Sequence, residues 1–250
     1  MRKSVNIHDI STFGKLDMIY NHIRTLEAKQ NNTKYKCLGS GKCCTIGLTI
    51  PMAECANIAY NLTQQYYLYL EDKGQEYADT WIDGIVNSLK EAMYDSTWKV
   101  GGETERKCVF FNNGCTIYKF RPMVCRTFGT VTGVDDYCPR IRNPFGQVDC
   151  YSGEGVKKII QLFQDTLEEY ASNNEPGYDV VVYMPLGVLS FMLPTPELLE
   201  MQENTDPKFW KAVDGWFNYR VQFTKDHGYE WPYLNEKSVS VGKKLVFNKE

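Results

Sequence analysis

The sequence CVFFNNGCTIYKFRPMVCR, residues 108–126, sets three cysteines in one short stretch with glycine, proline and arginine between them. An upstream stretch, CLGSGKCC at residues 37–44, holds three more, and Cys138 follows downstream. A bound metal needs several sulfurs at about 2.3 Å, which favours closely spaced cysteines on tight turns. Gly39 and Gly41 can supply the unusual backbone angles of such a turn. The sequence therefore predicts irregular, cysteine-rich segments that bind a metal.

The number and clustering of the cysteines favour ligation over other uses. Eight of the nine lie between Cys37 and Cys138, and the last 100 residues contain none. No continuous apolar run follows the basic N-terminus, so we expect no secretory signal and a cytoplasmic location. Structural disulfides are not expected in that reducing environment. Scattered core cysteines are the alternative, and the clustering argues against them.

The charge of the chain is nearly balanced, with a net charge of −3, but both cysteine segments are basic. Residues 34–44 hold three lysines and no acid, and residues 106–142 hold seven basic residues against two aspartates. Neighbouring cations favour the deprotonated thiol that binds metal. A basic surface for an anionic partner is the alternative. We expect neither a nucleic acid nor a membrane partner, and a protein or small-molecule partner stays open.

Apolar residues at helical spacing predict helices on both sides of the cysteines. The predicted helices cover residues 13–26, 51–62, 77–94, 156–170 and 209–221, with Pro51 opening the second. The apolar stretch VVVYMPLGVLSFML, residues 180–193, is broken by Pro185 and Gly187 and predicts buried core. A short β-hairpin could close the chain, with Val239 facing Phe247 across Gly242.

The fold class predicted from these elements is mainly α, with helices packed around an irregular, cysteine-rich metal-binding centre. We expect residues 1–150 to form the metal-binding domain and residues 151–250 a helical extension packed on it. Pro122 is expected at the first position of a helix that has Cys125 in its opening turn, where the helix dipole lowers a thiol pKa. Cys55 is expected in the core, and Cys150 is assigned no role.

The chain resembles the CxxCxxCC family of YkgJ-like proteins, described as zinc- or iron-chelating, over roughly residues 35–145. The resemblance rests on the spacing of the cysteines, on the Thr-Ile-Tyr after Cys115 and on the Arg121-Pro122 pair. It implies that the metal ligands come from seven thiols: Cys37, Cys43, Cys44, Cys108, Cys115, Cys125 and Cys138. One cluster with spare thiols, one cluster with an open coordination position, and two smaller sites all stay open. The chain departs from the family motif at Ser40, where the motif has a cysteine, and a serine hydroxyl is a poor replacement for a thiolate.

Cysteine ligands alone do not decide whether the bound group is zinc or an iron–sulfur cluster. Zinc takes four cysteines in many structural sites, commonly on CxxC turns, and this chain has no CxxC. Iron–sulfur clusters accept more varied spacings, and arginines can hydrogen-bond their sulfurs. These features favour a [4Fe–4S] cluster, with zinc as the alternative. None of the three histidines, His8, His22 and His227, lies in a cysteine segment.

Three functions fit such a centre. The first is a metal-binding protein for metal handling, electron transfer or partner docking. The second is an enzyme, because flagellin lysine N-methylases carry a similar cysteine cluster, and an open iron site could bind S-adenosylmethionine. No glycine-rich methyltransferase loop and no CxxxCxxC spacing support that second function. The third is a structural module in which zinc orders the loops. Whether the chain is an enzyme stays open.

Overall fold

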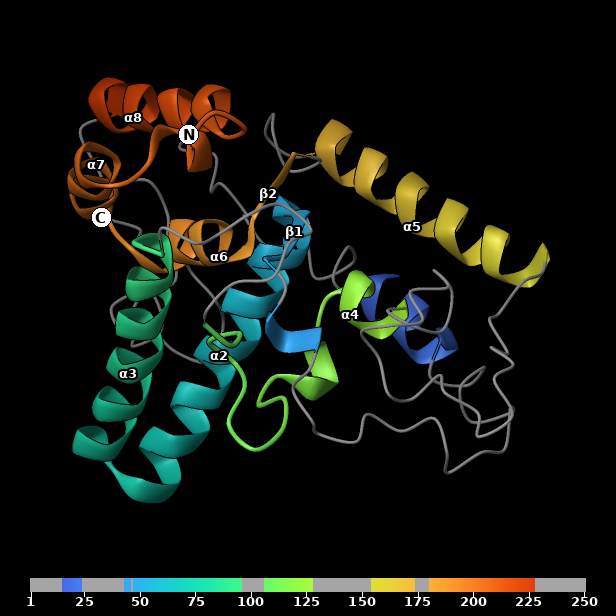
Figure 1. The fold of residues 1–250 in the computed structure, drawn as a ribbon, viewed down its shortest axis with the longest axis horizontal. Coiled ribbons are helices and arrows are strands. Elements are labelled where there is room, and N and C mark those ends of the chain that lie inside the picture. Colours follow the sequence, from blue (N-terminus) through green and yellow to red (C-terminus); the bar gives the residue numbers. More distant parts are fainter. Residues whose placement is uncertain are drawn as a thin grey trace.

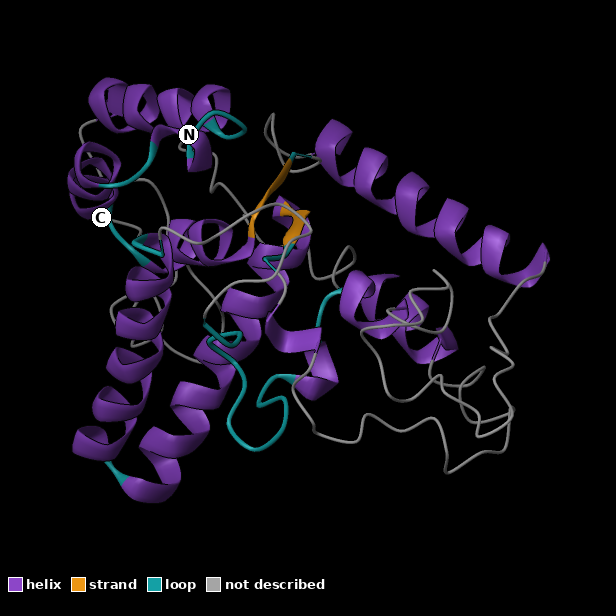
Figure 2. Cartoon of the chain, in the orientation of Figure 1, coloured by secondary structure: helices purple, strands orange, loops and turns teal. Residues whose placement is uncertain are grey.

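The computed structural model describes residues 15–23, 43–45, 47–95, 106–127, 154–173 and 180–227. These ranges are mostly helical, as expected, with one small antiparallel sheet (Figure 2). The hairpin predicted around Val239 and Phe247 lies outside the described residues. Of the helices in these ranges, none is both long enough and apolar enough to cross a membrane.

Helices α2 (Met52–Lys73) and α3 (Gln75–Met93) form a helical hairpin and lie side by side (Figure 1). Gly74 joins them with a φ of 87°, in the region that favours glycine. Pro51 directly precedes α2, and its φ of −58° suits a helix start. Both helices were predicted from their apolar spacing, and α2 extends eleven residues beyond the predicted end at residue 62, to Lys73.

A two-stranded antiparallel sheet joins the start of α2 to the second half of the chain. Strand β1 (Thr49–Pro51) pairs with β2 (Val181–Tyr183), with Ile50 opposite Val182. The Met52 amide donates to the Val180 carbonyl at 2.9 Å and so extends the pairing into α2. The sequence did not predict this sheet, because strands of three residues are too short to show an alternating pattern.

Helix α6 (Met184–Met192) lies at the centre of the fold, and all nine of its residues are buried. It packs against both α2 and α3. The predicted buried core is confirmed for residues 182–193, whereas Val181 at its start is exposed. Cys55 of α2 is fully buried in the same core, as predicted.

Helices α7 (Thr195–Asn204) and α8 (Asp214–His227) follow α6, with a 3-10 turn, Pro207–Phe209, between them. Arg220 of α8 is fully buried and donates to the Ser190 carbonyl at 2.5 Å and the Leu193 carbonyl at 2.7 Å. Its Nε donates to the Thr195 hydroxyl at 2.8 Å. These three bonds fix α8 against the end of α6.

Helix α5 (Glu154–Asn173) lies along the outer edge of the molecule (Figure 1). The predicted N-terminal helix is confirmed over residues 15–23, and its other residues lie outside the described ranges. Lys15 of that helix donates to a carboxylate oxygen of Glu169 in α5 at 2.6 Å. The division of the chain at residue 150 stays a prediction.

Candidate metal centre

Four of the seven predicted ligands have described side chains, one from the first cysteine segment and three from the second. Cys44 lies in a 3-10 turn, Cys43–Thr45, of which Cys43 is described in its backbone only. Cys108 and Cys115 lie in a turn-rich segment, and Cys125 lies in α4 (Met123–Thr127). All four side chains are partly exposed, unlike Cys55. Cys37 and Cys138 lie outside the described residues.

A backbone hydrogen bond joins the two cysteine segments. The amide of Cys108 donates to the carbonyl oxygen of Cys44 at 2.5 Å. The α2–α3 hairpin accounts for this contact, because it carries the chain away from Cys44 and back again (Figure 1). Thiols that are far apart in the sequence thus stand on neighbouring stretches of backbone.

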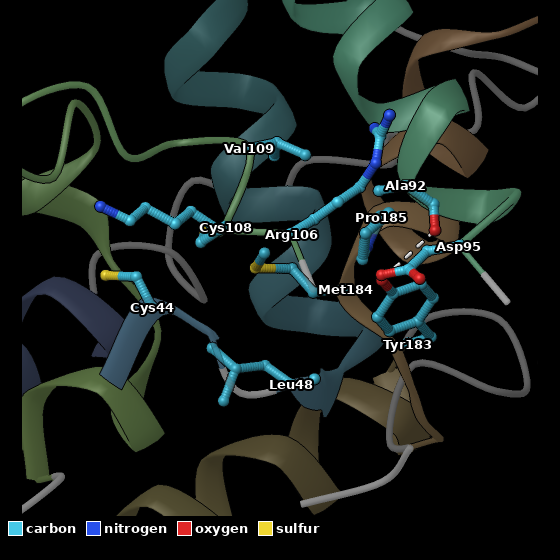
Figure 3. A pocket seen from close by; sticks show the side chains of 12 residues that line it. Cys44, Leu48, Ala92, Asp95, Arg106, Cys108, Val109, Tyr183, Met184 and Pro185 are labelled. Atoms are coloured by element: carbon cyan, nitrogen blue, oxygen red, sulfur yellow. Dashed lines mark hydrogen bonds between the residues drawn. The ribbon is translucent and has the colours of Figure 1, made fainter. Parts of the chain in front are cut away.

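Cys44 and Cys108 also line one small cavity of about 30 Å³ (Figure 3). Leu48, Val109 and Met184 contribute apolar wall, and this volume is enough for a water molecule or a small ion. Tyr183 lines the cavity too and donates to the Ala92 carbonyl at 3.4 Å. Burial raises the pKa of Tyr183, with Asp95 and Cys108 adding to the shift, so its phenol stays protonated.

The spacing of Cys108 and Cys115 is set by a tight turn. The Phe111 amide donates to the Cys108 carbonyl at 2.8 Å, and Phe111 forms a β-bridge with Cys115. Asn113 and Gly114, at the tip, have φ of 52° and 150°. Asparagine and glycine tolerate these angles better than other residues, which explains the Asn-Gly pair between the two cysteines. The glycines predicted to turn the first segment, Gly39 and Gly41, lie outside the described residues.

Cys125 lies in the opening turn of α4, as predicted. The Pro122 carbonyl accepts the amides of Cys125 and Arg126 at 3.0 and 3.1 Å. The helix begins at Met123, so Pro122 precedes the first helical position that the sequence had assigned to it. The Pro122 carbonyl accepts the first helical bonds, which places Pro122 just before the helix.

A buried carboxylate behind α4 was missed by sequence reasoning. Glu54 of α2 is 1% exposed, and its Oε1 accepts the Tyr20 hydroxyl and, at 2.7 Å, the Met123 amide. Burial raises the pKa of Glu54 to about 7, while both hydrogen bonds and the Arg126 guanidinium oppose the rise. The signal available in the sequence was an acid inside the apolar run from Met52 to Ala59.

Two arginines of the second cysteine segment are buried. Arg126 donates to the Arg121 carbonyl at 2.8 Å and the Lys119 carbonyl at 2.5 Å, and its guanidinium lies 4.0 Å from the ring centre of Tyr20. Arg121 lies over the Tyr118 ring at the same distance. The predicted basic character of this segment therefore includes two positive charges held inside the protein.

The donor set fits zinc or iron in its chemistry, because thiolates bind both. Within the described ranges, however, no three side chains of histidine, cysteine, aspartate or glutamate come together as a metal site. A complete ligand set would draw on Cys37, Cys43 and Cys138, whose side chains lie outside the description. His22 is exposed to solvent.

Comparison with known proteins supports the resemblance noted in the sequence. Residues 36–143 match the family model CxxCxxCC, described as a "putative zinc- or iron-chelating domain". Neither the curated proteins nor the solved structures yielded a match. The matched range contains all seven predicted ligands, together with Glu54 and Arg126. Residues 36–143 are thus similar to the CxxCxxCC family, over a range that covers less than half of the chain.

Proposed function

We propose that this protein binds a [4Fe–4S] cluster and serves electron transfer or metal handling. The ligands would come from seven thiols: Cys37, Cys43, Cys44, Cys108, Cys115, Cys125 and Cys138. The family description supports zinc or iron chelation in general, and the cluster type is our proposal. When bound, such a cluster supplies a one-electron redox centre.

The observation that carries the proposal is the hydrogen bond from the Cys108 amide to the Cys44 carbonyl. It links the two cysteine segments directly, so ligands from both can reach one centre. Both residues line the same small cavity, which has space for an ion (Figure 3). A core cysteine such as Cys55 is fully buried instead.

Two features favour iron–sulfur over zinc. The first is the absence of CxxC turns, on which zinc sites are commonly built. The second is the pair of buried guanidinium groups, Arg121 and Arg126, in the segment that carries Cys125. Positive charge near a cluster offsets the negative charge of its thiolates and sulfides and raises its reduction potential.

The test is metal and sulfide analysis of full-length protein purified without oxygen, together with its visible spectrum. We expect a brown protein with about four irons and four sulfides per chain. The variants C44S and C125S should each lose most of that iron. C55A is the matched control, because Cys55 lies in the core, and it should keep the iron.

Three results would count against the proposal. A colourless protein with one or two zinc ions would replace the cluster with a zinc site. Full iron content in both C44S and C125S would exclude these thiols as ligands. Loss of iron from C55A to the same extent would show that the losses report unfolding, and circular dichroism spectra of all variants would confirm that reading.

A further inference from the structure

The helix that carries Cys125 has no cap of its own. The first amides of any helix lack partners inside it, and a side chain just before the helix commonly accepts them. Pro122 stands at that position before α4, and a proline side chain cannot accept a hydrogen bond. The amide of Met123 therefore needs an acceptor from elsewhere in the fold.

Glu54 supplies this acceptor from α2. Its Oε1 lies 2.7 Å from the Met123 nitrogen, across 69 positions of sequence. The same oxygen accepts the hydroxyl of Tyr20, from the N-terminal helix. The carboxylate thus holds three elements together at the point where α4 begins: the helix at residues 15–23, α2 and α4 itself.

Arg126 fixes the other end of the same turn. Its side chain folds back onto the carbonyls of Lys119 and Arg121 and stacks on the ring of Tyr20, the residue that also binds Glu54. Cys125 lies between Met123 and Arg126. Its backbone is therefore held on both sides by contacts that lead to Tyr20 and Glu54.

The cost of burying an acid indicates that this arrangement has a purpose beyond packing. A carboxylate at 1% exposure loses its hydration, and an apolar side chain of similar size would fill the space at lower cost. What an apolar side chain could not do is accept the Met123 amide. The buried acid thus gives α4 a defined start at the expense of stability.

We infer that Glu54 is a positioning residue of the metal centre, which caps α4 from the neighbouring helix and so fixes the orientation of Cys125. The inference rests on the proposed function for the role of Cys125 as a ligand. The cap itself concerns the backbone of α4 and can be measured with or without metal.

The experiment measures thiol alkylation in the metal-free full-length protein, peptide by peptide, by mass spectrometry. Cys108 serves as an internal reference for the cysteine segments, and the buried Cys55 reports global unfolding. We expect E54A to raise the alkylation rate of Cys125 about tenfold or more, the effect of losing one buried hydrogen bond to a charged group. The rates of Cys108 and Cys55 should stay within a factor of two of wild type.

Two variants separate positioning from general stability. E54Q keeps an oxygen that can accept the Met123 amide, so it should restore the Cys125 rate to near the wild-type value. T63A removes another buried hydrogen bond of α2, from the Thr63 hydroxyl to the Ala59 carbonyl, and should leave the Cys125 rate unchanged. In metal-loaded protein, E54A should release its metal to a chelator faster than either variant.

Equal increases at Cys125, Cys108 and Cys55 in E54A would overturn the inference, since they would show general loosening. An unchanged Cys125 rate in E54A would overturn it as well. If wild-type protein holds no metal and E54A still exposes Cys125 selectively, the cap is supported and the proposed function fails. If metal binds through Cys125 and E54A changes nothing, the function stands and the positioning role fails.

Discussion

Gly187 of α6 faces Cys55 of α2 so closely that a Cβ at position 187 would stand 2.3 Å from the Cys55 Sγ. The Cγ1 of Val182 would stand 2.7 Å from the same point. Real Cβ atoms do not approach neighbours this closely, so only glycine fits there without a shift of the backbone or of its neighbours. This contact explains how α6 can lie against α2 in the middle of the core.

The variant G187A should therefore destabilise the protein by about 1–3 kcal/mol, the usual cost of overpacking a core. Urea unfolding followed by circular dichroism would measure the free energy of unfolding. The double variant C55A/G187A should recover part of the loss, because the sulfur is gone while Val182 remains.

G84A is the control: Gly84 lies exposed in α3 with no atom near its missing Cβ, and alanine should stabilise that helix slightly. An equal effect of G84A and G187A would contradict the packing explanation.

Stability should depend on pH through Glu54. Burial raises its pKa from 4.5 to about 7 in the folded protein, above its value in the unfolded chain. The resulting contribution to stability is therefore fully present below about pH 4.5 and is lost as the pH rises through 7. The loss between these limits is up to about 3 kcal/mol.

The measurement is the free energy of unfolding of metal-free protein at several pH values between 5 and 8, in wild type and E54Q. A glutamine does not ionise, so the stability of wild type relative to E54Q should fall as the pH rises. Using the difference between the two proteins cancels the titration of all other groups. Parallel curves for wild type and E54Q would mean that Glu54 does not titrate in this range.

The turn between Cys108 and Cys115 should be sensitive at Gly114 and tolerant at Asn113. Gly114 has a φ of 150°, which a side chain strains, so G114A should cost about 1–2 kcal/mol and lower metal retention. Asn113 has a φ of 52°, which glycine adopts without strain, so N113G should behave nearly as wild type. Metal content after incubation with a chelator would compare the two variants. Stronger loss from N113G than from G114A would contradict the role of these backbone angles.

The sequence predicted those parts of the fold that have a local signal. The apolar spacing in residues 51–62 and 77–94 predicted α2 and α3. Pro185 and Gly187 interrupt the apolar stretch at residues 180–193, which favoured buried core over a membrane span. Cys125 was expected in an opening turn because Pro122 marks a helix start. Each of these predictions depends on residues within a few positions of one another.

The parts that were missed depend on partners far along the chain. The sheet pairs Ile50 with Val182, and neither three-residue strand has a pattern of its own. Glu54 gains its role from Met123 and Tyr20, which no periodicity connects to it. In α2 alone, Glu54 is an ordinary acid in the first turn of a helix, where acids are common.

The hydrogen bond between Cys44 and Cys108 has a consequence for the order of assembly. Bringing these positions together closes a long loop, and the conformational entropy of that closure opposes binding when a metal must do it alone. Here the packing of α2 against α3 offsets that entropy and can do so before any metal arrives. We therefore expect metal binding to be a late event that follows the packing of these helices.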